Sequence, residues 1–131
     1  MNKSNRLTPA RVRKAYLETG LLPYFGNWFS ELTLSNIDKP CACAAAAVCM
    51  AENKKTSTSE EEVFTRSAVA KALGLTFDYV AGFVAGFDWN EIPTKLKNQR
   101  ENVLGYNDGM ACRVEAEGIM KWRFRMEESA Q

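Results

Sequence analysis

The fold depends most on the stretch Gly82-Phe-Val-Ala-Gly86, which is echoed downstream by Gly105-Tyr-Asn-Asp-Gly109. Residues four apart share one face of a helix, so each pair of glycines leaves a groove that another backbone can enter. Because a glycine inside a helix costs about 1 kcal/mol relative to alanine, four of them indicate a packing requirement. We therefore expect two adjacent antiparallel helices, over residues 77–87 and 99–117, that touch at these glycines. A turn at 107–109 is the alternative.

Capping signals predict three more helices upstream. Thr8 can cap a helix over residues 9–18, and Gly20 fits the left-handed position just past its end. A second helix is expected over residues 41–52, which are rich in alanine. A third is expected between the capping boxes at 57–62 and Gly74.

The C-terminal segment alternates between apolar and basic residues, which is the period-two pattern of a half-buried strand. Met120, Trp122, Phe124 and Met126 alternate with Lys121, Arg123 and Arg125. The aromatic segment at 22–34, which contains Pro23 and Gly26, is the other strand candidate. We expect 119–126 to pair antiparallel with it, leaving the basic side chains in solvent and the aromatic ones packed inward. The competing interpretation extends the last helix through the tail.

The composition predicts one mainly α domain over residues 1–131. A chain of 131 residues, 46% hydrophobic and 25% charged, suits a single compact domain. We expect a bundle of about five helices with at most one two-stranded pairing, and frayed ends at 1–7 and 127–131. No run is long enough for a membrane span, and the polar N-terminus lacks the apolar region of a signal peptide. These features predict a cytoplasmic protein with no membrane partner.

The residue types that usually carry catalysis or bind cofactors are scarce. Histidine is absent, which removes the commonest general base and metal ligand. Phosphate-binding loops, dinucleotide fingerprints and paired Cys-x-x-Cys spacing are absent too. Asp88 and Asp108 follow the two glycine motifs and could share a cleft, but capping or solvation is the commoner role for such residues. We expect no catalytic residue, no cofactor and no metal site.

Four cysteines occur, at Cys41, Cys43, Cys49 and Cys112. Three of them lie in the alanine-rich run, where a cysteine usually acts as a small buried apolar residue. We expect all four to be reduced and at least three to be buried. The alternative is a redox-active thiol at Cys41 or Cys43, since a helix N-terminus can lower a thiol pKa.

Several motifs follow one another in a distinctive order. They run from Tyr16-Leu-Glu-Thr-Gly-Leu-Leu-Pro23 through Cys41-Ala-Cys-Ala44 and Tyr79-Val-Ala-Gly-Phe-Val-Ala-Gly-Phe-Asp88 to the glycine motif at 105–109. In this order the chain resembles a group of small, uncharacterised bacterial proteins over residues 12–113. The resemblance implies a bacterial or phage origin and a compact helical fold. It carries no known activity, and therefore no catalytic residue.

The leading functional hypothesis is a small, non-enzymatic binding module that acts through a partner protein or through self-association. Aromatic residues are plentiful, and they make good interface anchors. The candidate binding residues are Trp89, Lys121, Arg123 and Arg125. The first alternative is nucleic-acid binding by the basic termini, although the net charge is only +1. The second alternative is a thiol-dependent redox protein.

Overall fold

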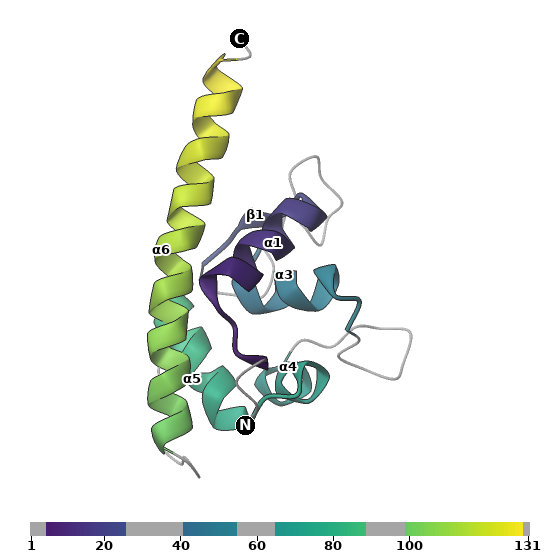
Figure 1. Cartoon of the computed structure of the whole chain (residues 1–131), viewed down its shortest axis with the longest axis vertical. Helices are drawn as coiled ribbons and strands as arrows, with labels where there is room; N and C mark the ends of the chain where they lie inside the picture. The colour runs from purple at the N-terminus through teal and green to yellow at the C-terminus, as the bar shows by residue number, and fades with distance from the viewer. Residues whose placement is uncertain (1–4, 26–40, 55–64, 89–98, 130–131) are drawn as a thin grey trace.

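The computed structural model describes residues 5–25, 41–54, 65–88 and 99–129. The helices in these ranges are α1 (Pro9–Thr19), α3 (Ala44–Ala51), α4 (Arg66–Leu73), α5 (Phe77–Asp88) and α6 (Gln99–Ser129). Two short strands, β1 (Leu22–Pro23) and β2 (Cys41–Ala42), complete the described elements. The described part of the chain is therefore mainly α, as predicted. The long helix α6 runs along one side of the molecule, and its last turns extend beyond the other elements (Figure 1).

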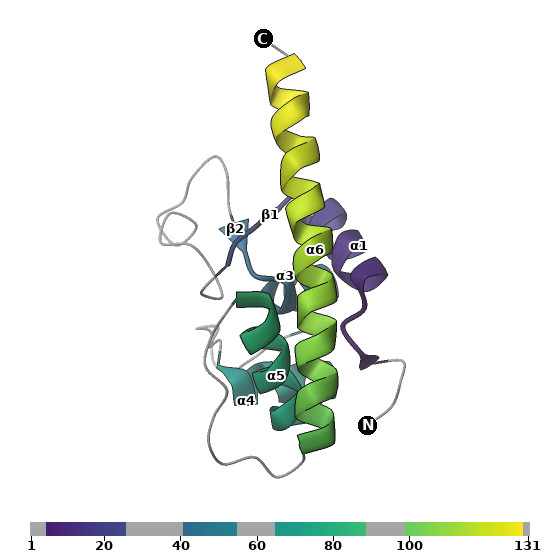
Figure 2. The ribbon, with the colours of Figure 1, turned by 90° about the vertical axis from the view of Figure 1, so that its left-hand side faces the viewer.

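The most extensive contact joins α5 and α6, which lie side by side (Figure 2). The glycines make this contact possible. A methyl group on Gly82 would overlap the backbone carbonyl oxygen of Asn102, and one on Gly105 would overlap that of Tyr79. The second glycine of each pair meets the opposite backbone in the same way, one turn further along. The predicted close packing of the two helices through their glycines is confirmed.

The predicted antiparallel direction of these helices is wrong, because α5 and α6 run parallel. Gly82 lies against Asn102 and Tyr106, whereas Gly86 lies against Tyr106 and Met110. The contacts thus advance in the same direction along both helices. A short connection favours antiparallel neighbours, and only ten residues, 89–98, join these two helices. Ten residues can nevertheless reach about 33 Å, and α5, with 12 residues, is only about 18 Å long.

Capping residues set the ends of the shorter helices. The Thr8 side chain accepts a hydrogen bond from the third residue of α1, and Gly20 follows that helix with φ 72°. Gly74 ends α4 with φ 68°. Helix α4 begins later than expected, because the Thr65 hydroxyl caps it by accepting a hydrogen bond from a backbone N–H. The capping boxes at 57–62 lie outside the described residues.

The alanine-rich helix α3 is the buried centre of the fold. Residues 44–49 are all no more than 1% exposed, and the helix packs against α1 and α4. Short side chains permit this close approach on several sides. The helix expected over 41–52 begins only at Ala44, because Cys41 and Ala42 are in β2.

The small sheet has a different partner and direction from those predicted. Strand β1 pairs with β2 in parallel, with Leu22 opposite Cys41 and Pro23 opposite Ala42. The segment expected to form a strand, 119–126, belongs instead to α6, so the helical alternative is correct. A period-two pattern indicates a strand only where one face is buried. The end of α6 extends beyond the other described elements, so no such constraint applies to it.

The N-terminal segment is anchored from residue 5 onward, which corrects the expectation that residues 1–7 are frayed. Leu7 is fully buried in the core. Its N–H donates to the Tyr79 hydroxyl at 2.9 Å, and its carbonyl accepts from the Cys112 thiol at 3.1 Å. The Asn5 amide donates to the Gly74 carbonyl. Residues 127–129, also expected to be frayed, are helical.

Within the described ranges, no single helix combines the length and apolar character needed to cross a membrane. Helices α4 and α5 reach that length and composition only as a pair, with a bend of 114° between them. In these two helices, residues 69, 70, 73 and 78–88 are buried inside the fold.

Candidate functional site

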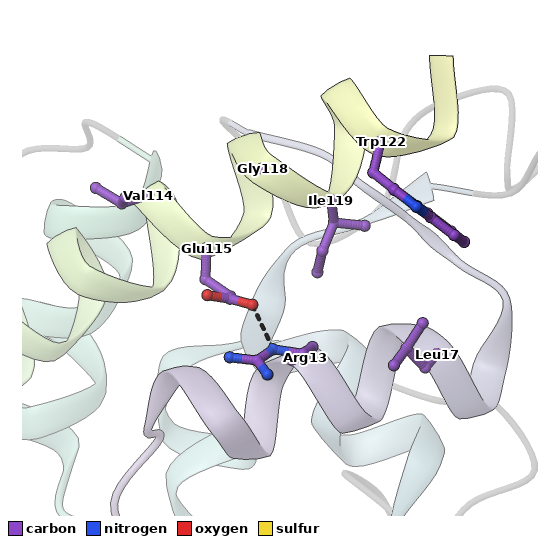
Figure 3. Close-up of a pocket in the computed structure, with 7 residues that line it drawn as sticks. All are labelled: Arg13, Leu17, Val114, Glu115, Gly118, Ile119 and Trp122. Atoms are coloured by element: carbon purple, nitrogen blue, oxygen red, sulfur yellow. Dashed lines mark hydrogen bonds and ion pairs between the residues drawn. The ribbon is translucent and has the colours of Figure 1, made fainter. Parts of the chain in front are cut away.

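A groove of about 370 Å³ lies between α1 and the C-terminal half of α6. Its lining comes from two helices that are far apart in the sequence (Figure 3). The lining residues are Arg13 and Leu17 from α1, and Val114, Glu115, Gly118, Ile119 and Trp122 from α6. Helical periodicity explains the α6 set, because residues three or four apart share one face.

Three large apolar side chains around this groove are more than half exposed. Leu17 is 56% exposed, Val114 is 70% exposed and Trp122 is 53% exposed. Ile119, at 8% exposed, packs against the core. Single exposed apolar residues are normal on a protein surface, and here three of them lie around one hollow.

Gly118 is part of the groove lining. A Cβ atom added at Gly118 would meet no atom within 4 Å. Its position thus differs from that of the glycines between α5 and α6, where an added side chain would overlap backbone. Gly118 is therefore not required for packing within the described fold.

An ion pair links the two walls. The Arg13 Nε lies 2.5 Å from Glu115 Oε1, and the pair crosses from α1 to α6 within the groove (Figure 3). Because Arg13 is largely exposed, the pair contributes no more than about 1 kcal/mol to stability. It neutralises both charges in the lining, which leaves the groove mainly apolar.

The predicted binding residues lie at different distances from this groove. Lys121 is exposed on α6, next to Trp122. Arg123 and Arg125 follow on the same helix, and their side chains lie outside the described part of the structure. Trp89 also lies outside the described residues. The prediction that Trp122 packs inward is wrong, because the helix presents its ring to the groove.

The basic residues near the N-terminus form ion pairs with acidic side chains. The ion pairs are Arg6–Asp108, Arg11–Glu52, Arg13–Glu115 and Lys14–Glu18. Hydrogen bonds from Arg11 hold the pKa of Glu52 below its ordinary value. These pairs reduce the positive potential that a basic nucleic-acid face at this end would need.

The buried carboxylate of Asp108 fastens the N-terminal segment to α6. It accepts two hydrogen bonds from Arg6, at 3.0 and 2.6 Å, and a third from the Tyr79 hydroxyl at 2.5 Å. Burial and the bond to Asp108 raise the pKa of Tyr79, so the phenol stays protonated as a donor. Asp88 is also buried, at the end of α5.

Three cysteines are buried thiols outside any disulfide: Cys43, Cys49 and Cys112. The prediction that at least three are buried is confirmed, and the side chain of Cys41 lies outside the described residues. Burial raises the pKa of Cys43 well above its ordinary value, aided by the charge of Asp88, and raises that of Cys112 to about 12. Neutral, buried thiols weigh against a redox role. Within the described ranges, no three acidic or cysteine side chains lie together as a metal site requires.

Sequence reasoning missed the groove as a unit. The signal was present at Val114, Gly118, Ile119 and Trp122, whose spacing marks one helix face. These four residues share a face only if segment 119–126 is helical, whereas the sequence analysis expects a strand there. The contribution of α1 could not be predicted, because Leu17 and Trp122 are brought together by packing between distant segments.

Comparison with known proteins gives no match: no family model, curated protein or solved structure is similar to the chain. The resemblance to small bacterial proteins therefore stays a prediction. The function has to be argued from the groove itself.

Proposed function

We propose that the chain is a non-enzymatic binding module that acts through a partner protein, with the groove between α1 and α6 as its binding site. The observation that supports this most is the set of Leu17, Val114 and Trp122, each more than half exposed around one groove. Covering the exposed part of each side chain is worth about 1 kcal/mol. Tryptophan is among the residue types that most often anchor a protein interface, and Leu17 and Val114 add apolar surface beside Trp122.

The rigidity of both walls supports the same proposal. Leu17 and Trp122 project from helices, and Ile119 packs against the core between them. The Arg13–Glu115 ion pair adds a link from one wall to the other. A surface that is ordered before binding loses less conformational entropy when a partner arrives.

The two alternatives have weaker support. The basic residues near the end of α6 still favour nucleic-acid binding. The basic residues of α1, however, form ion pairs with acidic side chains. A thiol-dependent activity would have to rely on a reactive thiolate. Burial raises the thiol pKa at Cys43 and at Cys112, which disfavours that form.

The test is to fill the groove without disturbing the fold. Gly118→Leu adds a large side chain to a residue of the groove lining, and its Cβ meets no atom within 4 Å. Asn107→Leu is the matched control, because it adds the same side chain at an exposed position of α6 outside the groove. Tagged wild-type chain and both variants are used to capture partners from cells that naturally express the protein, and mass spectrometry identifies them.

The proposal predicts a protein that is retained by the wild type and by Asn107→Leu but lost from Gly118→Leu. Circular dichroism should show the same helix content in all three chains. Capture of the same proteins by all three would contradict the proposal. Recovery of nucleic acid in place of a specific protein would favour the first alternative.

A further inference from the structure

Residues 5–8, which precede α1, form a strap that runs from the start of α1 toward α4 (Figure 1). Leu7 is fully buried within the strap, whereas the Arg6 side chain is 32% exposed. The Asn5 amide donates to the Gly74 carbonyl, just past the end of α4, at 3.1 Å. The strap therefore combines one buried apolar anchor with polar contacts near the surface.

One carboxylate, that of Asp108 on α6, holds the strap in two ways. It accepts two hydrogen bonds from Arg6, at 3.0 and 2.6 Å. It also accepts a bond from the Tyr79 hydroxyl, whose oxygen in turn accepts from the Leu7 N–H at 2.9 Å. A hydroxyl has a single hydrogen, so its bond to Asp108 leaves the oxygen lone pairs to accept from Leu7. The charge of Asp108 thus acts on the strap directly through Arg6 and indirectly through Tyr79.

The strap also covers the thiol of Cys112. The thiol donates to the Leu7 carbonyl at 3.1 Å, and Cys112 is fully buried. Burial raises the pKa of Cys112 to about 12, which keeps the thiol protonated while the strap is in place. The thiolate is the form that reacts with electrophiles. Displacement of the strap would admit solvent and reagents to this thiol and would remove the cause of its raised pKa.

Helix α1, into which the strap continues at Thr8, is held in the fold by contacts of its own. The Tyr16 hydroxyl donates to the Ala42 carbonyl at 2.8 Å, and both residues are fully buried. Arg11 of α1 donates to the Asn5 carbonyl at 2.6 Å, which ties that end of the strap to α1. The bonds from the strap to α5 and α6 can therefore break while α1 stays docked. Folded proteins undergo local openings of this kind.

We propose that the strap is a latch, which opens as one unit while the helices stay folded and which controls access to the Cys112 thiol. The charge of Asp108 keeps the latch closed, because it holds Arg6 and orients the hydroxyl of Tyr79. This inference goes beyond the proposed function and does not depend on the groove.

The first arm of the experiment measures how fast each cysteine of the folded wild type reacts with iodoacetamide, in which the thiolate displaces iodide. Peptide mass spectrometry follows Cys112 separately from Cys43 and Cys49. These two are internal controls, since each is 1% exposed in the core and belongs to a different part of the fold. The proposal predicts that Cys112 reacts at least about tenfold faster than either control, because a local opening is more frequent than global unfolding.

Low concentrations of urea add a second criterion to this arm. A local opening exposes little surface, so the rate at Cys112 should rise only slightly with urea. The rates at the two control cysteines depend on larger openings and should rise more steeply.

The second arm unlocks the latch by mutation. Arg6→Gln removes the charge-assisted bonds to Asp108, and Lys14→Gln is the matched control, because it removes the same charge from an exposed pair with Glu18. Arg6→Gln should accelerate the reaction of Cys112 about tenfold, the factor that one such bond is worth. Lys14→Gln should leave the rate unchanged. The two control cysteines should keep their wild-type rates in both variants.

Tyr79→Phe tests the indirect route from Asp108 to the strap. It removes the hydroxyl that accepts from the Leu7 N–H but keeps the Arg6–Asp108 pair. The reaction of Cys112 should again be accelerated, with the two control cysteines unaffected.

Three results would overturn the proposal. One is a wild-type rate at Cys112 equal to that at Cys43 and Cys49, which would mean that the strap leaves only when the whole fold does. Another is an unchanged rate at Cys112 in Arg6→Gln, which would mean that the thiol is reached by a different route. The third is equal acceleration of all three cysteines in the variants, which would mean that the bonds act on global stability alone.

Discussion

At the scale of single residues, buried polar groups hold the molecule together where apolar packing alone would leave the N-terminus loose. Asp108 receives hydrogen bonds from Arg6 and from Tyr79, and Leu7 is held between the Tyr79 hydroxyl and the Cys112 thiol. The order of residues gives no hint of this network, because its members are separated by up to 105 positions. The sequence therefore predicts a frayed end for residues 1–7 and a capping or solvated role for Asp108.

Replacing Asp108 with asparagine should destabilise the protein by about 2–3 kcal/mol. The change leaves the phenol of Tyr79 and the guanidinium of Arg6 without their charged acceptor in a largely buried place. Urea unfolding measures the loss. Glu18→Gln, which removes the acid of an exposed pair with Lys14, is the control and should cost less than about 0.5 kcal/mol. Equal losses of stability in the two variants would show that the Asp108 network stabilises the fold no more than an exposed ion pair does.

The Arg11–Glu52 pair predicts a dependence of stability on pH. The pKa of Glu52 is lowered by hydrogen bonds from Arg11. Because the pKa of Glu52 is lowered in the folded state, the pair makes its full contribution to stability above the unfolded pKa of 4.5. It is lost as the pH falls through the lower, folded value. Glu52→Gln should thus be less stable than the wild type at pH 7, by less than about 1 kcal/mol because the pair is partly exposed.

Urea unfolding at pH 7 and at about pH 3 tests this dependence. The difference between the wild type and Glu52→Gln should shrink at the lower pH. A difference that grows as the pH falls would contradict the assignment of the pair as stabilising.

At the scale of elements, what the sequence predicts well is local. The cap at Thr8, the left-handed glycines Gly20 and Gly74, and the close contact of α5 with α6 are all as expected. Each depends on residues within one turn, or on a backbone approach that only glycine permits. Direction and partner choice are not local. The parallel course of α5 and α6 and the pairing of β1 with β2 depend on how distant segments meet.

The glycines of the α5–α6 contact should resist substitution. In Gly86→Ala or Gly105→Ala the methyl group overlaps backbone of the facing helix. Overpacking should cost about 1–3 kcal/mol and outweigh the gain in helix propensity of about 1 kcal/mol. Thermal melts should therefore show lower melting temperatures for both variants.

Gly118→Ala is the matched control for these variants. Position 118 lies on the long helix α6, and no atom is near the added methyl group. The free energy of unfolding of this variant should therefore rise by up to about 1 kcal/mol. Higher melting temperatures for Gly86→Ala and Gly105→Ala as well would show that the two helices are not in close contact at the glycines.

At the scale of the whole molecule, the fold leaves one long helix partly uncovered. The body formed by α1, α3, α4 and α5 lies along part of α6, and the last turns of α6 continue past it (Figures 1 and 2). The groove with α1 lies near this end, where Leu17 and Trp122 remain exposed. The alternation of aromatic and basic residues, read in the sequence as a strand, is thus a helix end beside the groove.

The central claim is that this groove is where a partner protein binds, and site-specific photocrosslinking tests it most directly. A photoreactive phenylalanine analogue replaces Leu17 in the groove or, as a control, Met50, an exposed apolar residue of α3 outside the groove lining. Irradiation in cells that naturally express the chain, followed by mass spectrometry, identifies the products. The account predicts one protein crosslinked from position 17 and not from position 50. No crosslink from position 17, or the same products from both positions, would contradict it.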